Sequence, residues 1–173
     1  MTGKSVLITG ANKSIGYETA KQLGLLGYRI WLGSRDAERG ASAAQKLSSE
    51  GVDVRVIAID VADEDSVKNA AATVSAADGK LDVLINNAGI PGSYTVPGAQ
   101  EISEIETVYQ TNVFGPIRTT QAFLPMLRAS GQANVIMVSS GLGSLTWLSD
   151  PAHPYHAVNI LAYNSSKTAL NAI

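Results

Sequence analysis

A tyrosine and a lysine lie four positions apart near the end of the 173-residue chain, at Tyr163 and Lys167. Residues four apart share one face of a helix, so the phenol and the ammonium would point into the same space. A free tyrosine has a pKa near ~10, and a neighbouring cation lowers it. Such a pair can exchange a proton with a carbonyl or hydroxyl oxygen. Taken alone, this spacing is more often ordinary helix surface, so its meaning depends on the rest of the chain.

A glycine-containing turn directly follows the first apolar run, Val6–Ile8, and has the sequence TGANKSIG. Its first glycine permits a tight turn, and its last permits close packing of helix against strand. The free N–H groups and dipole of a helix start attract a pyrophosphate. Ser14 is the expected N-cap. A turn that simply needs glycine is the alternative, but the position between a strand and an amphipathic helix favours dinucleotide binding. The predicted cofactor-binding residues here are Gly10, Asn12, Lys13, Ser14, Ile15 and Gly16.

Short apolar runs alternate with helix-favouring segments along the chain, which is typical of parallel strands buried on both faces. The predicted strands are 6–8, 30–32, 54–59, 81–85 and 135–138. The predicted helices are 15–26, 36–49, 63–77 with Asp63 as N-cap, 105–127 with an interruption at Gly115–Pro116, and a last helix from Ile160 onward; residues 141–159 are expected to form a loop. This order predicts an α/β fold in one domain over residues 1–173. It is a three-layer, doubly wound parallel sheet of the Rossmann type, with ligands at the carboxyl ends of the strands.

The composition excludes several other functions. The formal net charge of −2 gives no reason to expect a nucleic acid or an anionic membrane as partner. The chain has no cysteine, and His153 and His156 are its only histidines, so we expect no metal site. The first apolar run is too short for a secretory signal or a membrane span, which makes a cytoplasmic location the default expectation.

Three motifs in this order resemble the short-chain dehydrogenase/reductase family, and the match runs from Val6 to Lys167. TGANKSIG is similar to the TGxxxGxG turn of the family, with Ser14 where the family usually has its middle glycine. Asn86–Gly89 is identical to the NNAG motif, and Tyr163–Lys167 matches YxxxK. The resemblance implies catalytic roles for Asn112, Ser140, Tyr163 and Lys167, with Ser139 as the runner-up to Ser140. It also implies that Asp60, Val61, Asn87, Ala88, Gly89, Tyr163 and Lys167 contact the cofactor.

The choice between the two nicotinamide cofactors depends on the end of the second predicted strand. NAD-binding folds place an acidic residue there, against the ribose 2′-hydroxyl. This chain has Ser34 followed by Arg35, with Arg39 one helical turn on and Lys13 in the glycine turn. Cations at this point suit a 2′-phosphate, so we predict NADP(H) in preference to NAD(H), as in the carbonyl-reductase-like branch of the family. A solvated helix start is the alternative interpretation of the two arginines.

The resemblance implies reversible hydride transfer between NADP(H) and a small carbonyl or alcohol substrate, with the proton supplied by the protein. A non-catalytic nucleotide-binding fragment or regulatory module of the same fold is the alternative. An epimerase or dehydratase of the extended family is less favoured, because that branch has a different glycine pattern.

Family members continue beyond the last motif, so we expect this chain to be incomplete at its C-terminus. It is then either part of a longer gene product or a weak fragment that is prone to association. Ser140 and Tyr163 are 23 positions apart, which is longer than usual for the family. The extra residues, around 147–156, either shape substrate access or form a surface loop. They border helices that the family commonly uses for self-association, so a homo-oligomer is a candidate state.

Overall fold

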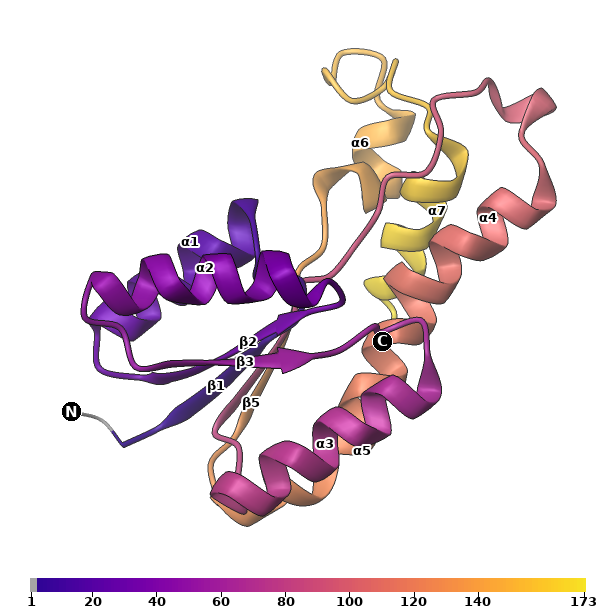
Figure 1. Cartoon of the computed structure of the whole chain (residues 1–173). Coiled ribbons are helices and arrows are strands. Elements are labelled where there is room, and N and C mark those ends of the chain that lie inside the picture. Colours follow the sequence, from indigo (N-terminus) through magenta and orange to yellow (C-terminus); the bar gives the residue numbers. More distant parts are fainter. Residues whose placement is uncertain (1–2) are drawn as a thin grey trace.

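Five parallel strands form one central sheet in the computed structural model, which describes residues 3–173 (Figure 1). The order across the sheet is β3-β2-β1-β4-β5, and every neighbouring pair is parallel. The strands are β1 (Ser5–Ile8), β2 (Arg29–Ser34), β3 (Val54–Ala58), β4 (Val83–Asn86) and β5 (Asn134–Met137). The predicted fold class is therefore confirmed, with each strand within a few residues of its expected place.

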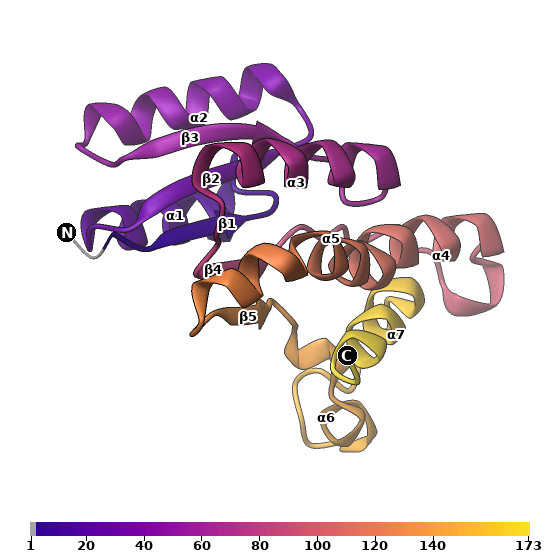
Figure 2. The ribbon, with the colours of Figure 1, turned by 90° about the horizontal axis from the view of Figure 1, so that it is seen from below.

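Helices cover both faces of the sheet (Figure 2). They are α1 (Ser14–Leu25), α2 (Ala37–Ser49), α3 (Glu64–Asp78), α4 (Ile102–Tyr109), α5 (Gly115–Ser130), α6 (Leu145–Ser149) and α7 (Leu161–Leu170). One apolar core joins the sheet to α1 and α2 through Ala20, Ala43 and Leu47. The other joins it to α3 and α5, with Val74 and Phe123 fully buried. Burial of this kind supplies most of the driving force for the fold.

Aspartate side chains begin two of these helices as the sequence predicts. The Asp36 carboxylate accepts a hydrogen bond from the backbone N–H of Arg39, and Asp63 accepts one from Ser66 at 2.6 Å. Each satisfies a backbone donor that a helix start leaves without a partner, which is worth about 1 kcal/mol.

Helix α1 packs against the sheet through small residues. Its buried positions are Gly16, Ala20 and Gly24, whereas Ile15 is 66% exposed. A Cβ added to Gly24 would lie 2.2 Å from Cγ1 of Val52. The apolar spacing of residues 15–26 therefore predicts the helix correctly, but the buried face is not the one that carries its large apolar residues. The buried face consists of glycine and alanine, because only small residues allow this close approach.

The long helical segment is not broken at Gly115–Pro116, where the sequence predicts an interruption. Residues 110–114 form a π-helical turn that joins α4 directly to α5, and Pro116 lies in the first turn of α5. Proline has no N–H to donate to the preceding turn, and the irregular π-helical turn lies directly before it. The predicted loop over residues 141–159 also contains structure, namely a 3₁₀ turn at Gly141–Gly143 and the short helix α6.

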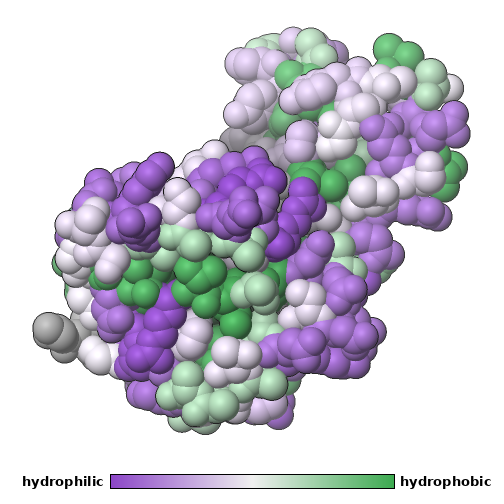
Figure 3. All heavy atoms as spheres, viewed as in Figure 1, coloured by the Kyte–Doolittle hydropathy of each residue, from purple (hydrophilic) through white to green (hydrophobic). Residues whose placement is uncertain are grey.

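Helices α4, α6 and α7 project beyond the carboxyl ends of the strands (Figure 1). The surface is hollowed between this projection and the body formed by the sheet with α1 and α2 (Figure 3). Hydrophobic surface also lies along the edge strand β3, where Val56 is 37% exposed (Figure 3). Within residues 3–173, no helix combines the length and the apolar character needed to cross a bilayer.

Candidate active site

A cleft of about 300 Å³ lies at the carboxyl ends of the strands and is bordered by the glycine turn. We call it the glycine-turn cleft. Twelve of the predicted cofactor-binding residues line it: Gly10, Asn12, Lys13, Ser14, Ile15, Gly16, Arg35, Asp60, Val61, Asn87, Ala88 and Gly89. Ile59, Ile90 and Thr111 complete the lining, and sequence reasoning missed them. Only their place in the sequence could have indicated them, because they are the direct neighbours of the predicted residues Asp60, Gly89 and Asn112.

The backbone of the glycine turn is left-handed at two positions. Gly10 has a φ of 64° and Ser14 has a φ of 51°. An L-residue in this conformation costs about 1–2 kcal/mol relative to the right-handed region, and glycine avoids that cost. Ser14 thus occupies the left-handed position that the family fills with glycine, so the turn keeps its shape at some expense of stability.

The N-cap of α1 is Lys13, not Ser14 as the sequence predicts. No side chain within residues 3–173 caps this helix, and its first turn contains no acidic residue. The first intrahelical hydrogen bond runs from the N–H of Tyr17 to the carbonyl oxygen of Lys13, so the N–H groups of Ser14, Ile15 and Gly16 precede the helical ladder, and these residues line the cleft. Such an arrangement fits an anionic group such as a pyrophosphate.

The glycine turn and the NNAG segment hold each other in place. Nδ2 of Asn87 donates to the carbonyl oxygen of Thr9 at 2.8 Å. The hydroxyl of Thr9 accepts from the backbone N–H groups of Asn87 and Ala88, each at 3.0 Å. A Cβ on Gly16 would lie 2.5 Å from the same Nδ2 atom. Thr9 was not predicted as a site residue, but its hydroxyl connects the two motifs.

The basic rim of this cleft is smaller than the sequence predicts. Lys13 and Arg35 line it. Arg39 instead pairs with Asp36, with its Nε at 2.6 Å from the carboxylate. The hydroxyl of Ser34, a residue only 1% exposed, donates to the carbonyl oxygen of Asp36. The sequence predicts three cations and the Ser34 hydroxyl at this cleft. Only Lys13 and Arg35 line it, because Arg39 and Ser34 interact with Asp36 instead.

A second cleft of about 370 Å³ adjoins the first and contains Tyr163 and Lys167. We call it the tyrosine cleft. The two clefts share Ile15, Asn87, Gly89 and Ile90 in their linings, so they lie side by side. An extended ligand could therefore reach from the glycine turn to Tyr163.

Lys167 is buried beneath this cleft, with 4% of its surface exposed. Its Nζ donates to the carbonyl oxygen of Val138 at 2.7 Å and lies 5.7 Å from the centre of the Tyr163 ring. Burial lowers the pKa of Lys167, because the charged ammonium loses its hydration. The cation therefore faces the tyrosine from a fixed position on the same helix.

Asn112 lies in the π-helical turn and is fully buried. Its amide makes a two-way connection with Ile90: Oδ1 accepts from the backbone N–H, and Nδ2 donates to the carbonyl oxygen, both at 2.9 Å. Nδ2 also donates to the hydroxyl of Ser166 at 3.0 Å, and that hydroxyl donates to the carbonyl oxygen of Tyr163. Asn112 thus connects the segment after β4 to the helix that carries Tyr163.

The two serines after β5 have different surroundings. Ser139 lines the tyrosine cleft and donates to Oδ1 of Asn171 at 2.5 Å. Ser140, the preferred candidate from the sequence, is half-buried and caps the 3₁₀ turn by accepting from the N–H of Leu142 at 3.2 Å. The structure therefore brings Ser139 together with Tyr163 and Lys167, and it places Ser140 one residue outside this lining.

The segment between Ser140 and Tyr163 folds over the start of the 3₁₀ turn. The rings of Trp147 and His153 stack with their centroids 4.7 Å apart, and Tyr155 meets both edge to face. A Cβ on Gly141 would lie 2.5 Å from Trp147 and 2.6 Å from Tyr155. This aromatic cluster therefore covers the backbone next to Ser140.

The chemistry available at this site follows from its geometry. The phenol of Tyr163, the buried ammonium of Lys167 and the hydroxyl of Ser139 lie in one cleft, and the adjoining cleft offers N–H groups of a helix start and two cations. This combination defines a dinucleotide-dependent oxidoreductase of the doubly wound class. The family model described as short chain dehydrogenase matches residues 4–173, and the chain belongs to that family of oxidoreductases.

Similar proteins with assigned names support this family assignment. The protein named short-chain dehydrogenase anuI of Penicillium roqueforti is 39% identical over 179 residues, an alignment that covers 100% of this chain and 71% of the relative. The (+)-neomenthol dehydrogenase of Arabidopsis thaliana is 35% identical over 165 residues, covering 83% of this chain and 56% of the relative. The chain thus spans between about half and 71% of the lengths of these two relatives.

Solved structures show the same fold. The NADPH-bound carbonyl reductase from chicken fatty liver superposes with a TM-score of 0.87 at 32% identity, covering 99% of this chain and 71% of that one. A short-chain dehydrogenase/reductase from Burkholderia phymatum, solved in complex with NAD, gives a TM-score of 0.83 at 27% identity, covering 98% and 57%. Similar structures therefore contain either nicotinamide cofactor.

Proposed function

We propose that this protein transfers a hydride reversibly between NADP(H) and a small carbonyl or alcohol substrate. The observation that carries the proposal is that the two clefts share four lining residues, so the glycine turn lies in one and Tyr163 and Lys167 lie in the cleft beside it. The residues present fit a dinucleotide, since the start of α1 has no side-chain cap and suits a pyrophosphate, and Gly16 beside it has no room for a Cβ. The cofactor, when bound, supplies the hydride chemistry.

The side chains supply binding and the proton. Tyr163 donates a proton to the carbonyl oxygen during reduction and accepts it in the reverse direction. The Lys167 ammonium, held by Val138, stabilises negative charge on the phenol oxygen. Ser140 positions the substrate oxygen, with Ser139 as the alternative that already lines the cleft. Asn112 keeps Ile90 and the Tyr163 helix in register.

Replacement of the general acid tests this function. We expect Tyr163→Phe to lower the turnover of NADPH with a ketone and aldehyde panel by roughly 10²- to 10⁴-fold, because the proton donor is lost while the ring is retained. The dissociation constant of NADPH, measured by fluorescence titration, should stay within a factor of about two to three. Comparable turnover by the variant would contradict the assignment. NADPH binding by a native protein that reduces no carbonyl compound would favour the non-catalytic nucleotide-binding alternative.

The cofactor preference depends on Arg35 and Lys13 at the rim of the glycine-turn cleft. We expect Arg35→Ala to weaken NADPH binding by about tenfold or more and to leave NADH binding nearly unchanged, since only NADPH carries the 2′-phosphate. Arg39→Ala is the matched control, because Arg39 is already paired with Asp36. Dissociation constants for both cofactors and both variants provide the measurement. A native protein that binds NADH more tightly than NADPH would refute the preference.

Other features of the protein remain proposals from the sequence. These are one domain over residues 1–173, a cytoplasmic location and a homo-oligomeric state. Size-exclusion chromatography with light scattering tests the last of them.

A further inference from the structure

The tyrosine cleft has a nearly uncharged lining. Pro91, Tyr94, Leu142 and Ile160 form its apolar wall around Tyr163. In the part of the chain that the structure describes, Lys167 is the only charged residue that lines it. The Lys167 ammonium donates to the carbonyl oxygen of Val138 and faces Tyr163, and under the proposed function its remaining N–H donors serve the phenol and the cofactor. The described lining therefore offers no further cation to a substrate.

An anionic substrate would lose hydration here and would have to compete with the phenol and the cofactor for the one lysine of the lining. Moving a carboxylate or phosphate out of water is costly unless it finds a charged, hydrogen-bonded partner. An uncharged apolar substrate gains instead from contact with the wall, by about 25 cal/mol for each Å² of apolar surface that it buries. Ligand sites of this volume commonly combine an apolar lining with a few placed polar groups, which here are the phenol of Tyr163 and the hydroxyl of Ser139.

Tyr94 lies at the rim of this cleft and is 76% exposed. It belongs to the segment between β4 and α4, which turns at Gly92 with a φ of 72°. An exposed aromatic ring offers a large contact area at a small cost in conformational entropy, because only two side-chain torsions must be ordered. Its position beside Pro91 and opposite the end of β5 allows it to cover a bound molecule.

We propose that the substrate is an uncharged, predominantly apolar ketone or aldehyde, or the corresponding alcohol, and that Tyr94 is the residue that covers it and sets the selectivity. This inference rests on the proposed reductase function and names the substrate class of the same site. It assigns to Tyr94 a role in binding and none in proton transfer.

A matched pair of ketones tests the substrate class. The compounds 4-methylcyclohexanone and 4-oxocyclohexanecarboxylate share a ring and a carbonyl group and differ in charge. We expect kcat/KM with NADPH to be at least about tenfold higher for the neutral ketone, and 4-oxocyclohexanecarboxamide separates the effect of charge from that of polarity. Equal or higher kcat/KM for the carboxylate would overturn the inference while leaving the reductase function intact.

Binding measurements keep the two proposals distinguishable. Calorimetric titration of each ketone into the protein saturated with NADP⁺ measures selectivity without turnover. Preferential binding of the neutral ketone without any reduction supports the substrate class and contradicts the reductase function. Binding of neither ketone, or tighter binding of the carboxylate, overturns the substrate class.

Variants of Tyr94 test its role. Tyr94→Ala should raise KM for 4-methylcyclohexanone by about three- to tenfold with kcat little changed, and Tyr94→Phe should restore the native KM, because the ring and not the hydroxyl makes the contact. Val96→Ala, at a 69% exposed position of the same segment outside the cleft lining, is the control. An unchanged KM in Tyr94→Ala, or a loss of kcat alone, would remove Tyr94 from the proposal.

Discussion

At the scale of single residues, Lys167 combines a functional position with a cost to stability. Its ammonium is buried, holds Val138 and faces Tyr163. Burial lowers the pKa of Lys167, so the folded state binds its proton less tightly than the unfolded state does. The charge therefore weakens folding below the lowered pKa, and the cost is relieved as the pH rises from that value towards the ordinary value for lysine.

The variant Lys167→Met separates these two effects. We expect turnover to fall by roughly 10²- to 10⁴-fold, because the cation beside Tyr163 is lost. In urea denaturation from neutral to alkaline pH, the native protein should gain stability relative to the variant as the lysine loses its proton. Lys46→Met, at an exposed site on α2, is the control and should follow the native pH dependence. Parallel curves for the native protein and Lys167→Met would contradict the burial argument.

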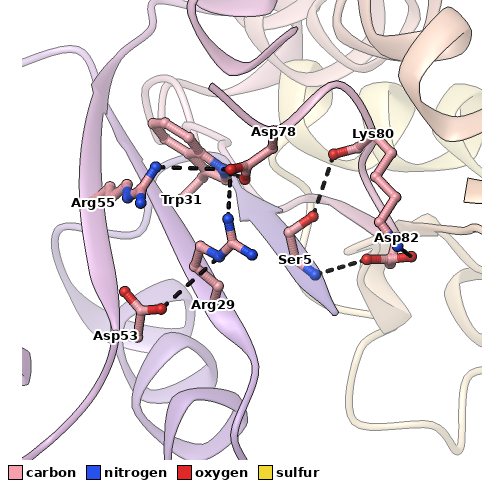
Figure 4. A network of polar contacts seen from close by, with 8 residues as sticks. All are labelled: Ser5, Arg29, Trp31, Asp53, Arg55, Asp78, Lys80 and Asp82. Atoms are coloured by element: carbon pink, nitrogen blue, oxygen red, sulfur yellow. Dashed lines mark hydrogen bonds and ion pairs between the residues drawn. The ribbon is translucent and has the colours of Figure 1, made fainter. Parts of the chain in front are cut away.

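At the scale of elements, polar contacts at the amino ends of the strands join helices to the sheet, far from the clefts (Figure 4). Asp78, at the end of α3, pairs with Arg29 of β2 at 2.5 Å and accepts from Nε1 of Trp31 at 2.8 Å. Asp82 accepts from the backbone N–H of Ser5 in β1 and from the hydroxyl of Ser130 at the end of α5. These two carboxylates fix both helices that cover one face of the sheet.

The hydrogen bonds by which Asp82 joins β1 to the end of α5 depend on pH. Burial raises the pKa of Asp82, but the hydrogen bonds from Ser130 and Ser5 and the nearby lysines Lys80 and Lys4 outweigh it and hold the pKa below its ordinary value. A depressed pKa contributes stability that is present at neutral pH and is lost as the pH falls through the folded-state value. The contacts of α5 with β1 should therefore weaken in acid.

The variant Asp82→Asn should lower the free energy of unfolding at pH 7 by about 1–3 kcal/mol, since two hydrogen bonds to a charged acceptor are weakened. Its stability should also fall less steeply than that of the native protein below pH 5. Chemical denaturation at several pH values measures both effects, and NADPH affinity should not change. Asp53→Asn is the control, because Asp53 is 69% exposed and lies 3.9 Å from Arg29, where surface pairs contribute little. An equal decrease in the free energy of unfolding in Asp82→Asn and Asp53→Asn would contradict the prediction.

At the scale of the whole molecule, both edges of the sheet are open in the described chain. Strand β5 pairs only with β4 there, and its consecutive residues Val135 and Ile136 are 42% and 45% exposed. Successive strand residues point to opposite faces, so both faces of β5 present apolar surface. An open edge with apolar side chains favours pairing with other chains.

We expect this edge to cause self-association. Ile136→Lys should reduce the apparent mass measured by light scattering across a concentration series, because a charge on an edge strand opposes pairing. Ile102→Lys, at a 68% exposed position on α4, is the control for added charge away from a strand edge. An unchanged concentration dependence in Ile136→Lys would show that association, if present, uses another surface.

Local patterns were sufficient to predict the sheet, most of the helices and the glycine-turn residues of the cleft, and the family resemblance indicated most of the other lining residues. A glycine turn after a buried strand and the NNAG segment each act over a few neighbouring residues, and parallel topology then brings the strand ends together. The same locality explains why Asp63 was correctly predicted as an N-cap, since its acceptor and donor are three residues apart.

Only the tertiary structure decided which partner each polar side chain takes. Asn87 holds the glycine turn through Thr9 across 78 positions, and Asn112 joins Ile90 to Ser166 across 22 and 54 positions. The left-handed backbone of Ser14 and the position of Ser139 beside Tyr163 were likewise known only from the tertiary structure. Sequence spacing predicts which backbone element a residue belongs to, whereas its hydrogen bonds and burial depend on neighbours that only folding brings near.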